Sequence, residues 1–386
     1  MKKFLTLPNL YIALWGLYFT QGTLLPKGSM LSRITLLLFF AISVGSLVVT
    51  YTRQKSNSYI KALGVLLAMF TVYGLFSAGD GVNYLKTIYL SLLPTYSFFV
   101  FFKQKKIDER WVRIVFYFMA VVVLVQYRIE MTHNEEIFLN SEEHVVNLGY
   151  EFLALLPLIY FWKKKPIVQY VLLALIMVMV LSTVKRGAII IGVLFIVYFL
   201  ITSTRYSSKK IKWYIWLLGA VFVVLAVRYA IHFFENNQYA QMRVENTLSG
   251  DSSSRDYLYT LAWRIFKDSD PINMLFGHGA LSTWRLMGNA AHNDWLEILV
   301  NQGIFGVVIY LYYWISFFKL YKKDKNIDSH LISGSLVIIY FMSTLFSMSY
   351  GAMTLPASVA LGYCLANENK TILSNKQQNE YLDNIA

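Results

Sequence analysis

Long runs of apolar residues separated by short polar segments dominate the sequence. A bilayer core of about 30 Å needs roughly 20 apolar residues per helix, which is close to the length of most of these runs. The pattern predicts an all-α, polytopic integral membrane protein with about twelve transmembrane helices in a single membrane domain, residues 1–386. We place the helices at residues 9–25, 34–50, 62–78, 86–102, 112–127, 147–162, 166–183, 187–203, 212–230, 294–318, 331–349 and 352–366. The first and last are short or interrupted by Gly and Pro, which is also typical of re-entrant segments.

Basic residues are distributed among the loops in a way that indicates an orientation. With the N-terminus in the cytoplasm, 23 of the 35 Lys and Arg residues fall in the inner segments, and every short inner loop is basic. Cytoplasmic loops of membrane proteins carry such an excess. We therefore predict that both termini are cytoplasmic and that residues 367–386 form a cytoplasmic tail. Residues 231–293 then form one long extracytoplasmic loop between the ninth and tenth helices.

Composition agrees with a membrane protein and excludes other classes. Charged residues make up 15% of the chain, whereas soluble domains carry about 25%. The net charge of +13 lies mainly in short loops at one membrane face, so we expect no nucleic-acid partner. The single cysteine, Cys364, allows neither an intrachain disulfide nor a cysteine-based zinc site. The N-terminus has a basic end and an apolar run but no clear cleavage site, so we expect a retained first helix.

The long loop at 231–293 is the first place where chemistry is expected, because loops of this length in compact proteins are usually functional or disordered. The stretch 246–254 reads NTLSGDSSS, which is typical of disorder. From Asp256 onward apolar residues recur at helical spacing, and we predict a short helix lying on the membrane surface. Arg255 at its start and Arg264 further along would either reach lipid headgroups or bind a phosphate.

A second candidate is Lys185-Arg186 in LSTVKRGAIII, which the topology places at the outer end, against the positive-inside bias. Snorkelling to the membrane surface explains such cations in part. An Arg where a helix begins can also present its planar guanidinium to an oxyanion, assisted by neighbouring amides. Lys86 and Glu151 also lie close to this face and are further candidates for substrate binding.

The third candidate is His292, where the long loop returns to the membrane. Asn293 is a good N-cap, and Asp294 and Glu297 then fall in the first turn, where capping and the helix dipole favour carboxylates. Gly303 and Gly306 would let a neighbouring helix approach. A histidine at a helix start is often structural, but at a membrane surface within reach of arginines it suits acid–base work or phosphate binding. These residues indicate a cationic site for an anionic headgroup such as a diphosphate.

Two motifs resemble those of the O-antigen polymerase and ligase family of bacterial membrane glycosyltransferases. The segment FGHGALSTW followed by AAHNDWLEILVNQGIFG is similar to the family's glycine-containing turn, His-Asn pair and Gly-x-x-Gly helix. The segment LSTVKRGAII resembles its Ser/Thr-x-x-Arg-Gly helix entry. Together with the helix plan and the long loop, the resemblance covers nearly the whole chain. Gln302 departs from the pattern, because an acidic residue is expected there.

The resemblance implies an enzyme that transfers a glycan from an undecaprenyl diphosphate carrier to a sugar acceptor at the outer face of the bacterial inner membrane, without a metal or a nucleotide sugar. It implies that Arg186 and Arg255 hold the donor diphosphate and that His292 assists the attack or the departing group. Substrate-binding roles are expected for Lys86, Lys185, Arg264, Glu151 and Asn293. We expect no cofactor. The expected partners are the lipid-linked oligosaccharide donor, the glycan acceptor, membrane lipids, a chain-length regulator and a flippase.

Three functions are considered for a chain with these features. Our leading hypothesis is a polymerase that extends an O-antigen or capsular-type polysaccharide. The alternative is a ligase that moves finished glycan to a lipid A core and differs in its acceptor. A third class, a flippase or another transporter of lipid-linked sugars, would show internal repeats and ionisable residues at the bilayer midplane, and the sequence shows neither.

Overall fold

The structure, a computed structural model, describes residues 6–21, 25–26, 28–54, 57–77, 80–137, 148–162, 164–206, 209–237, 240–242, 244–245, 249, 255–324, 326–347, 350 and 354–368. Throughout these ranges the chain forms helices and connecting turns, and the described part contains no strand. The helices of the first half are α1 (Leu7–Phe19), α2 (Met30–Gln54), α3 (Ser58–Leu75), α4 (Gly81–Lys103), α5 (Glu109–Ile137), α6 (Gly149–Leu153), η1 (Leu156–Trp162), α7 (Pro166–Ser182) and α8 (Arg186–Arg205). They are followed by α9 (Lys209–Glu235), α11 (Arg255–Lys267), α12 (Pro271–Phe276), α13 (Ser282–Met287), α14 (Asp294–Lys323), α15 (Ile327–Leu336), η2 (Val337–Phe341), α16 (Met342–Phe346) and α17 (Thr354–Asn367).

The predicted class, an all-α polytopic membrane protein, is confirmed. Each of the twelve predicted segments contains a helix in its described part, and eight helices in the described ranges are long and apolar enough to cross a membrane. The others are shorter than the roughly 20 residues that a span needs. They are α1, with 13 residues, and the apolar segments Gly149–Trp162, Pro166–Ser182 and Leu355–Asn367. The count of twelve spans therefore stays a prediction.

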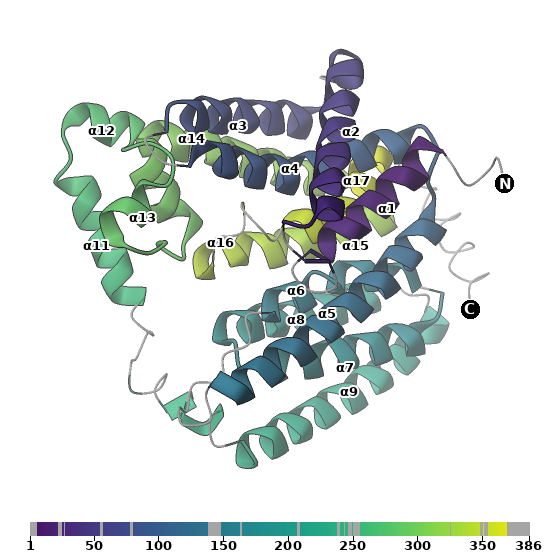
Figure 1. Cartoon of the computed structure of the whole chain (residues 1–386). Coiled ribbons are helices and arrows are strands. Elements are labelled where there is room, and N and C mark those ends of the chain that lie inside the picture. Colours follow the sequence, from purple (N-terminus) through teal and green to yellow (C-terminus); the bar gives the residue numbers. More distant parts are fainter. Residues whose placement is uncertain are drawn as a thin grey trace.

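Most of the long helices run in roughly the same direction, so the molecule has two ends (Figure 1). The short helices α11, α12 and α13 gather at the left end, and α1 lies towards the right. These three helices occupy the second half of the predicted long loop, and α11 confirms the helix expected from Asp256 onward. The stretch 250–254 and the end of the predicted cytoplasmic tail, residues 369–386, lie outside the described residues.

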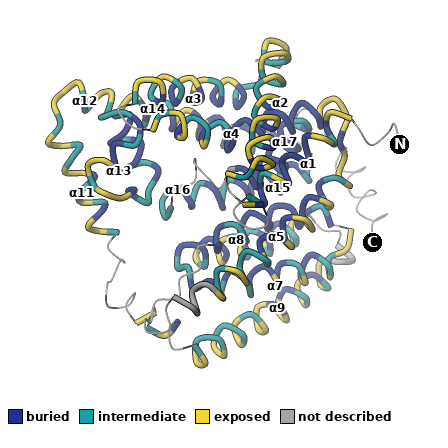
Figure 2. The backbone as a smooth tube through the Cα atoms, in the orientation of Figure 1, coloured by how far each residue is buried: buried dark blue, intermediate teal, exposed yellow. Residues whose placement is uncertain are grey.

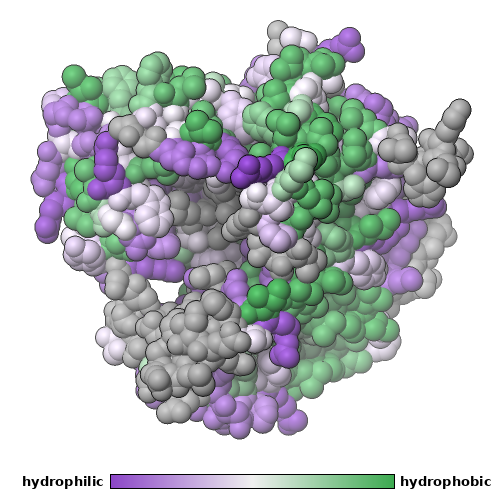
Figure 3. Space-filling model, viewed as in Figure 1, coloured by the Kyte–Doolittle hydropathy of each residue, from purple (hydrophilic) through white to green (hydrophobic). Residues whose placement is uncertain are grey.

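Burial separates the helices of the core from those that face outward (Figure 2). Helix α4 packs against α17, and both are largely buried. Helices α2 and α9 instead expose apolar residues such as Val48, Val49 and Leu225. Hydrophobic side chains cover the visible face over α1, α2 and α5, whereas hydrophilic ones gather over α11 to α13 (Figure 3). An exposed apolar face on a helix of spanning length is the surface that lipid covers.

Helix α14 is bent at Gly303, whose backbone angles (φ 67°, ψ −165°) are not helical. Two carbonyl oxygens just before the bend accept hydrogen bonds from the loop between α12 and α13. The amides of His278 and Gly279 donate to the oxygens of Val300 and Asn301, both at 2.9 Å. The polar backbone groups near the bend are thereby paired inside the protein, as a membrane environment requires.

The neighbour that approaches Gly303 is the end of the short helix α12. A Cβ atom at Gly303 would lie 2.5 Å from the backbone nitrogen of Gly277 and from the carbonyl oxygen of Leu275. The partner is therefore the C-terminal end of α12 with its cap Gly277, and the positive φ of Gly303 further favours glycine. A Cβ atom at Gly306 would meet side chains of its own helix, Gln302 and Ile298.

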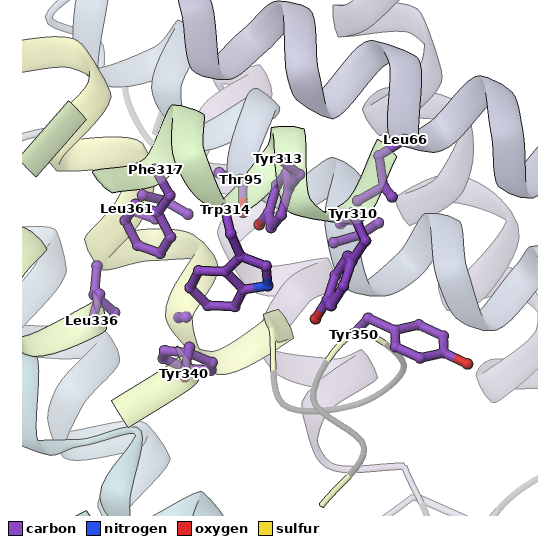
Figure 4. A pocket seen from close by; sticks show the side chains of 12 residues that line it. Leu66, Thr95, Tyr310, Tyr313, Trp314, Phe317, Leu336, Tyr340, Tyr350 and Leu361 are labelled. Atoms are coloured by element: carbon purple, nitrogen blue, oxygen red, sulfur yellow. The ribbon is translucent and has the colours of Figure 1, made fainter. Parts of the chain in front are cut away.

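Aromatic side chains fill the core beneath this bend. Tyr310, Tyr313 and Trp314 of α14 surround a cavity of about 20 Å³ together with Tyr340 of η2 and Tyr350 (Figure 4). A cavity of this volume holds about one water molecule. It is too small for a sugar, so the substrate site must be sought elsewhere.

Candidate active site

Four parts of the chain that are far apart in sequence meet at the end of the molecule that carries α11 to α13. They are the start of α6, the start of α8, the start of α11 and the start of α14, and the end of α16 closes the group. The candidate residues that they contribute are Tyr150, Lys185, Arg186, Arg255, His292 and Asn293.

Asn293 fixes the entry of the chain into α14, as predicted. Its Oδ1 accepts hydrogen bonds from the amides of Trp295 (3.0 Å) and Leu296 (3.2 Å), and its Nδ2 donates to the carbonyl oxygen of Leu345 (3.3 Å). The cap therefore ties α14 to the end of α16. His292, the residue before it, has a φ of 50°, which is strained for a residue other than glycine. Such strain persists where the surrounding contacts enforce it.

Glu297 makes some of the contacts that hold the backbone before His292. It is 1% exposed, and it accepts hydrogen bonds from the hydroxyl of Thr283, from the amide of Ala291 (2.8 Å) and from Nδ2 of Asn301 (3.2 Å). The carboxylate thus anchors the loop that precedes His292. The sequence had suggested helix capping for this residue, and the structure corrects that role. The side chain turns into the protein, because three buried donors are available there.

Arg255, the first residue of α11, reaches across to α6. Its guanidinium donates a hydrogen bond to the hydroxyl of Tyr150, which in turn donates to the carbonyl oxygen of Phe346 at 3.2 Å. Tyr150 is buried and lies over the first turn of α8, where a Cβ atom at Gly187 would collide with its hydroxyl. The glycine after Arg186 therefore gives Tyr150 the space from which it holds Arg255.

Lys185 and Arg186 begin α8, and both are half-buried. Val184 before them has a φ of 51°, an unusual conformation for a β-branched residue. Both α8 and α14 are thus preceded by a strained non-glycine backbone. Strain of this kind clusters at functional sites, where it costs about 1–3 kcal/mol per residue.

The charges around His292 favour its neutral form. Burial, then the nearby guanidinium of Arg255, then the ammonium group of Lys185 lower the pKa of His292 below its usual value of 6.5. The imidazole is half-buried and lies on the loop before α14. A neutral imidazole beside two cations can accept a proton while the cations bind an anion.

Tyr259, one turn after Arg255, joins α11 to the same place. Its hydroxyl lies 3.1 Å from the carbonyl oxygen of Leu345 and 3.4 Å from that of His292. Tyr150 and Tyr259 were not among the residues predicted from the sequence. Tyr150 directly precedes the predicted Glu151, so the segment was recognised but the side chain that points into the site was not.

Three predicted residues have other surroundings. Lys86 donates to Oδ1 of Asn83 at 2.6 Å near the start of α4. Arg264 is exposed and lies nine residues after Arg255, which places it about 180° around α11. The electrostatic neighbours of Glu151 are Glu130 of α5 and Tyr340 of η2.

Two further residues of α14 have structural partners. Asp294 is fully buried and accepts a hydrogen bond of 2.6 Å from the hydroxyl of Tyr310, so it links the site to the aromatic core. Gln302 is buried too, and its Nε2 donates to the hydroxyl of Tyr84 at 3.2 Å. Both side chains point into the protein. In the described ranges, no group of three or more His, Cys, Asp or Glu side chains is arranged to hold a metal ion.

Residues 170–311 match the model of a protein family described as O-antigen ligase. The matched region contains Lys185, Arg186, Arg255 and the His292-Asn293 pair, whereas Tyr150 precedes it. A comparison with curated proteins found no match. The family match supports the resemblance inferred from the two sequence motifs, and it covers the long loop and the entry to α14.

Proposed function

From the O-antigen ligase family domain at residues 170–311 and the cationic site inside it, we propose that this chain transfers glycan from a polyprenyl diphosphate carrier. The family match indicates a role in the assembly of O-antigen or a related polysaccharide, and together with the apolar helices it indicates a bacterial inner-membrane protein. The finer assignments follow from the residues. The end of the molecule with α11 to α13 is the extracytoplasmic face, and both termini are cytoplasmic.

The observation that carries this proposal is that His292 lies within electrostatic reach of Arg255 and Lys185. The departing group is a diphosphate, on which negative charge develops as the glycosidic bond breaks. Preformed cations in a partly dehydrated site stabilise such charge more than water does. Arg186, Arg255 and Lys185 fill this role, and Asn293 fixes the backbone next to His292 by capping α14.

His292 then acts as the base. The acceptor hydroxyl gives its proton to the imidazole as its oxygen attacks the anomeric carbon. The bond from that carbon to the diphosphate oxygen breaks, and the electron pair leaves with the diphosphate. A single displacement of this kind inverts the anomeric configuration. No metal or nucleotide sugar takes part in these steps.

We assign the chain as a polymerase that extends an O-antigen or capsular polysaccharide. The description of the matched family favours the second candidate, a ligase that delivers glycan to a lipid A core. The two activities share the donor and differ in the acceptor. A chain-length regulator and a flippase are the proposed protein partners.

The test is to incubate purified protein in liposomes with a lipid-linked oligosaccharide, with or without lipid A core, and to separate the products on a gel. A ladder of lengths supports the polymerase, and transfer only to the lipid A core supports the ligase. If no product forms with either acceptor although the protein is folded and inserted, the proposal is overturned.

Arg255→Gln and Arg264→Gln form a matched pair for the site. They lie on the same helix but on opposite faces. We expect Arg255→Gln to lower the transfer rate at least about a hundredfold, because it removes a preformed charge that stabilises the leaving group. Arg264→Gln should retain most of it, because its side chain is exposed away from His292. Equal losses in the two variants would contradict this site.

A further inference from the structure

A second cavity, of about 420 Å³, lies at the end of the molecule opposite to the candidate active site. Two continuous segments connect the two places. The chain runs from Tyr150 at the active site to Trp162 at the cavity, and from Asp328 at the cavity to Leu345 at the active site. At 1.5 Å per residue the second segment spans about 25 Å. In the predicted orientation, the cavity therefore opens at the cytoplasmic face.

Side chains of both signs line this cavity. Arg113 of α5 and the exposed Lys164 and Lys165 between η1 and α7 contribute positive charge. Glu109 at the start of α5 and Asp328 of α15 contribute negative charge. A ligand with a single charge would meet repulsion from one of these sets. A ligand with separated positive and negative groups would be attracted by both.

Aromatic side chains form one wall of the cavity, and one of them orients the carboxylate of Glu109. Phe161, Trp162 and Tyr363 line it, and the hydroxyl of Tyr363 donates to Oε1 of Glu109 at 3.0 Å. This hydrogen bond holds the Glu109 carboxylate against the wall. Aromatic side chains with a polar end are typical of the membrane–water boundary, where one part of the ring is apolar and the other is hydrated.

The surroundings of the cavity favour a lipid over a soluble ligand. Ile114 and Tyr117 follow Arg113 on α5, and Ile167 follows Lys165 on α7; all three are exposed. Helix α5 is long and apolar enough to cross a membrane, so its exposed apolar side chains face acyl chains. A phospholipid whose tails lie along α5 would bring its headgroup to the cavity.

We propose that this cavity binds the headgroup of a phospholipid that carries both a phosphate and a primary ammonium group, that is, of the phosphatidylethanolamine class. The phosphate is held by Arg113, Lys164 and Lys165, and the ammonium group by Glu109 and Asp328. In the predicted orientation the lipid comes from the cytoplasmic leaflet. This site is independent of the transfer reaction, because none of its lining residues belongs to the candidate active site.

Native mass spectrometry of the full chain, exposed to equal amounts of phosphatidylethanolamine, phosphatidylcholine and phosphatidylglycerol with identical acyl chains, tests the proposal. We expect phosphatidylethanolamine to be retained in preference to both others. The bulky quaternary ammonium of phosphatidylcholine cannot donate hydrogen bonds to carboxylates, and phosphatidylglycerol has no positive charge. Equal retention of phosphatidylethanolamine and phosphatidylcholine would overturn the proposal.

Variants separate the two halves of the headgroup. Glu109→Gln still accepts the hydrogen bond from Tyr363 but loses its charge, so the preference for phosphatidylethanolamine over phosphatidylglycerol should fall about fivefold, the effect of one exposed ion pair. Lys164→Gln with Lys165→Gln should weaken retention of all three lipids. Lys105→Gln with Lys106→Gln is the control, because these exposed lysines do not line the cavity. An equal loss in the control would contradict the site.

A soluble competitor distinguishes a lipid from a free phosphate ester. Phosphoethanolamine at the same concentration as the lipid should not displace it, because it lacks the acyl chains that lie along α5. Displacement at equal concentration would overturn the assignment to a lipid.

Discussion

A Cβ atom at Gly187 would overlap the hydroxyl oxygen of Tyr150, so these two residues occupy their places only because residue 187 has no side chain. The same hydroxyl receives the hydrogen bond from Arg255 and donates to the carbonyl oxygen of Phe346. The Arg-Gly pair at the start of α8 therefore acts in two ways. Arg186 supplies a charge, and Gly187 supplies the space in which Tyr150 positions a second charge.

Gly187→Ala should displace Tyr150 and with it Arg255. We expect about a hundredfold loss of transfer activity with little change in membrane insertion, since small displacements of positioning groups cost this much. The transfer rate in liposomes measures the effect. Tyr150→Phe removes the hydroxyl that holds Arg255 and should lower the activity by itself, so adding Gly187→Ala to it should cost less than in the wild type, because the oxygen that clashes is already gone. Gly45→Ala, where no atom lies within 4 Å of the added methyl group, is the control and should be neutral.

The pH dependence of transfer should report His292. Its pKa lies below 6.5 because burial and two cations disfavour the charged imidazole. A base works only when neutral, so kcat/KM should be flat above about pH 6.5 and fall as the pH drops through the pKa of His292 in the free enzyme. Arg255→Gln removes one of the cations, which raises the pKa of His292 and moves this fall to higher pH. An unchanged midpoint in the residual activity of that variant would argue against His292 as the base.

Gly303→Ala should destabilise the junction between α14 and the loop after α12. The new methyl group would lie 2.5 Å from backbone atoms of Gly277 and Leu275, and the positive φ adds strain. We expect a loss of roughly 2 kcal/mol or more in stability. Thermal unfolding in detergent would show this as a lower Tm than that of the wild type and of Gly45→Ala. A Tm equal to that of Gly45→Ala would mean that the loop tolerates the displacement.

Glu297→Gln tests the anchor of the loop before His292. Only one oxygen remains to accept hydrogen bonds from Thr283, Ala291 and Asn301, so at least one buried donor loses its partner. A cost of roughly 1–3 kcal/mol is expected, together with lower transfer activity. Asp268→Asn is the control. It removes the charge of an exposed carboxylate after α11 and should change neither the stability nor the transfer activity. Limited proteolysis between α13 and α14 would detect the loosened loop, and unchanged cleavage would contradict this role.

The sequence predicted those features that depend on local chemistry. Asn293 caps α14 because its short amide side chain can reach the free amides of the first turn. The start of α11 at Arg255 follows from the apolar spacing of the residues after it. Lys185 and Arg186 are exceptions to the positive-inside bias in the predicted orientation, and both lie at the start of α8. Each of these signals lies within a few residues.

Features that depend on contacts between distant segments could not be predicted in this way. Tyr150 is one of 28 tyrosines, and nothing near it in the sequence indicates that it contacts Arg255. Gly303 was recognised as a position of close approach to a helix, but nothing near it in the sequence indicates that this helix is the short α12, which ends just before Gly277. Glu297 resembles a helix-capping residue by position, and only the fold shows that three donors surround it.

The bend at Gly303 also determines where the chain can be exchanged between related proteins. The part of α14 before the bend is hydrogen-bonded to the loop after α12 and to α13, whereas the part after it lines the aromatic core, and Asp294 joins the two parts through Tyr310. An exchange should therefore keep residues 255–302 together. A chimera joined at Asp294, where α14 begins, would divide this segment, whereas one joined at Gly303 would carry α11 to α13 together with the helical turns that support them.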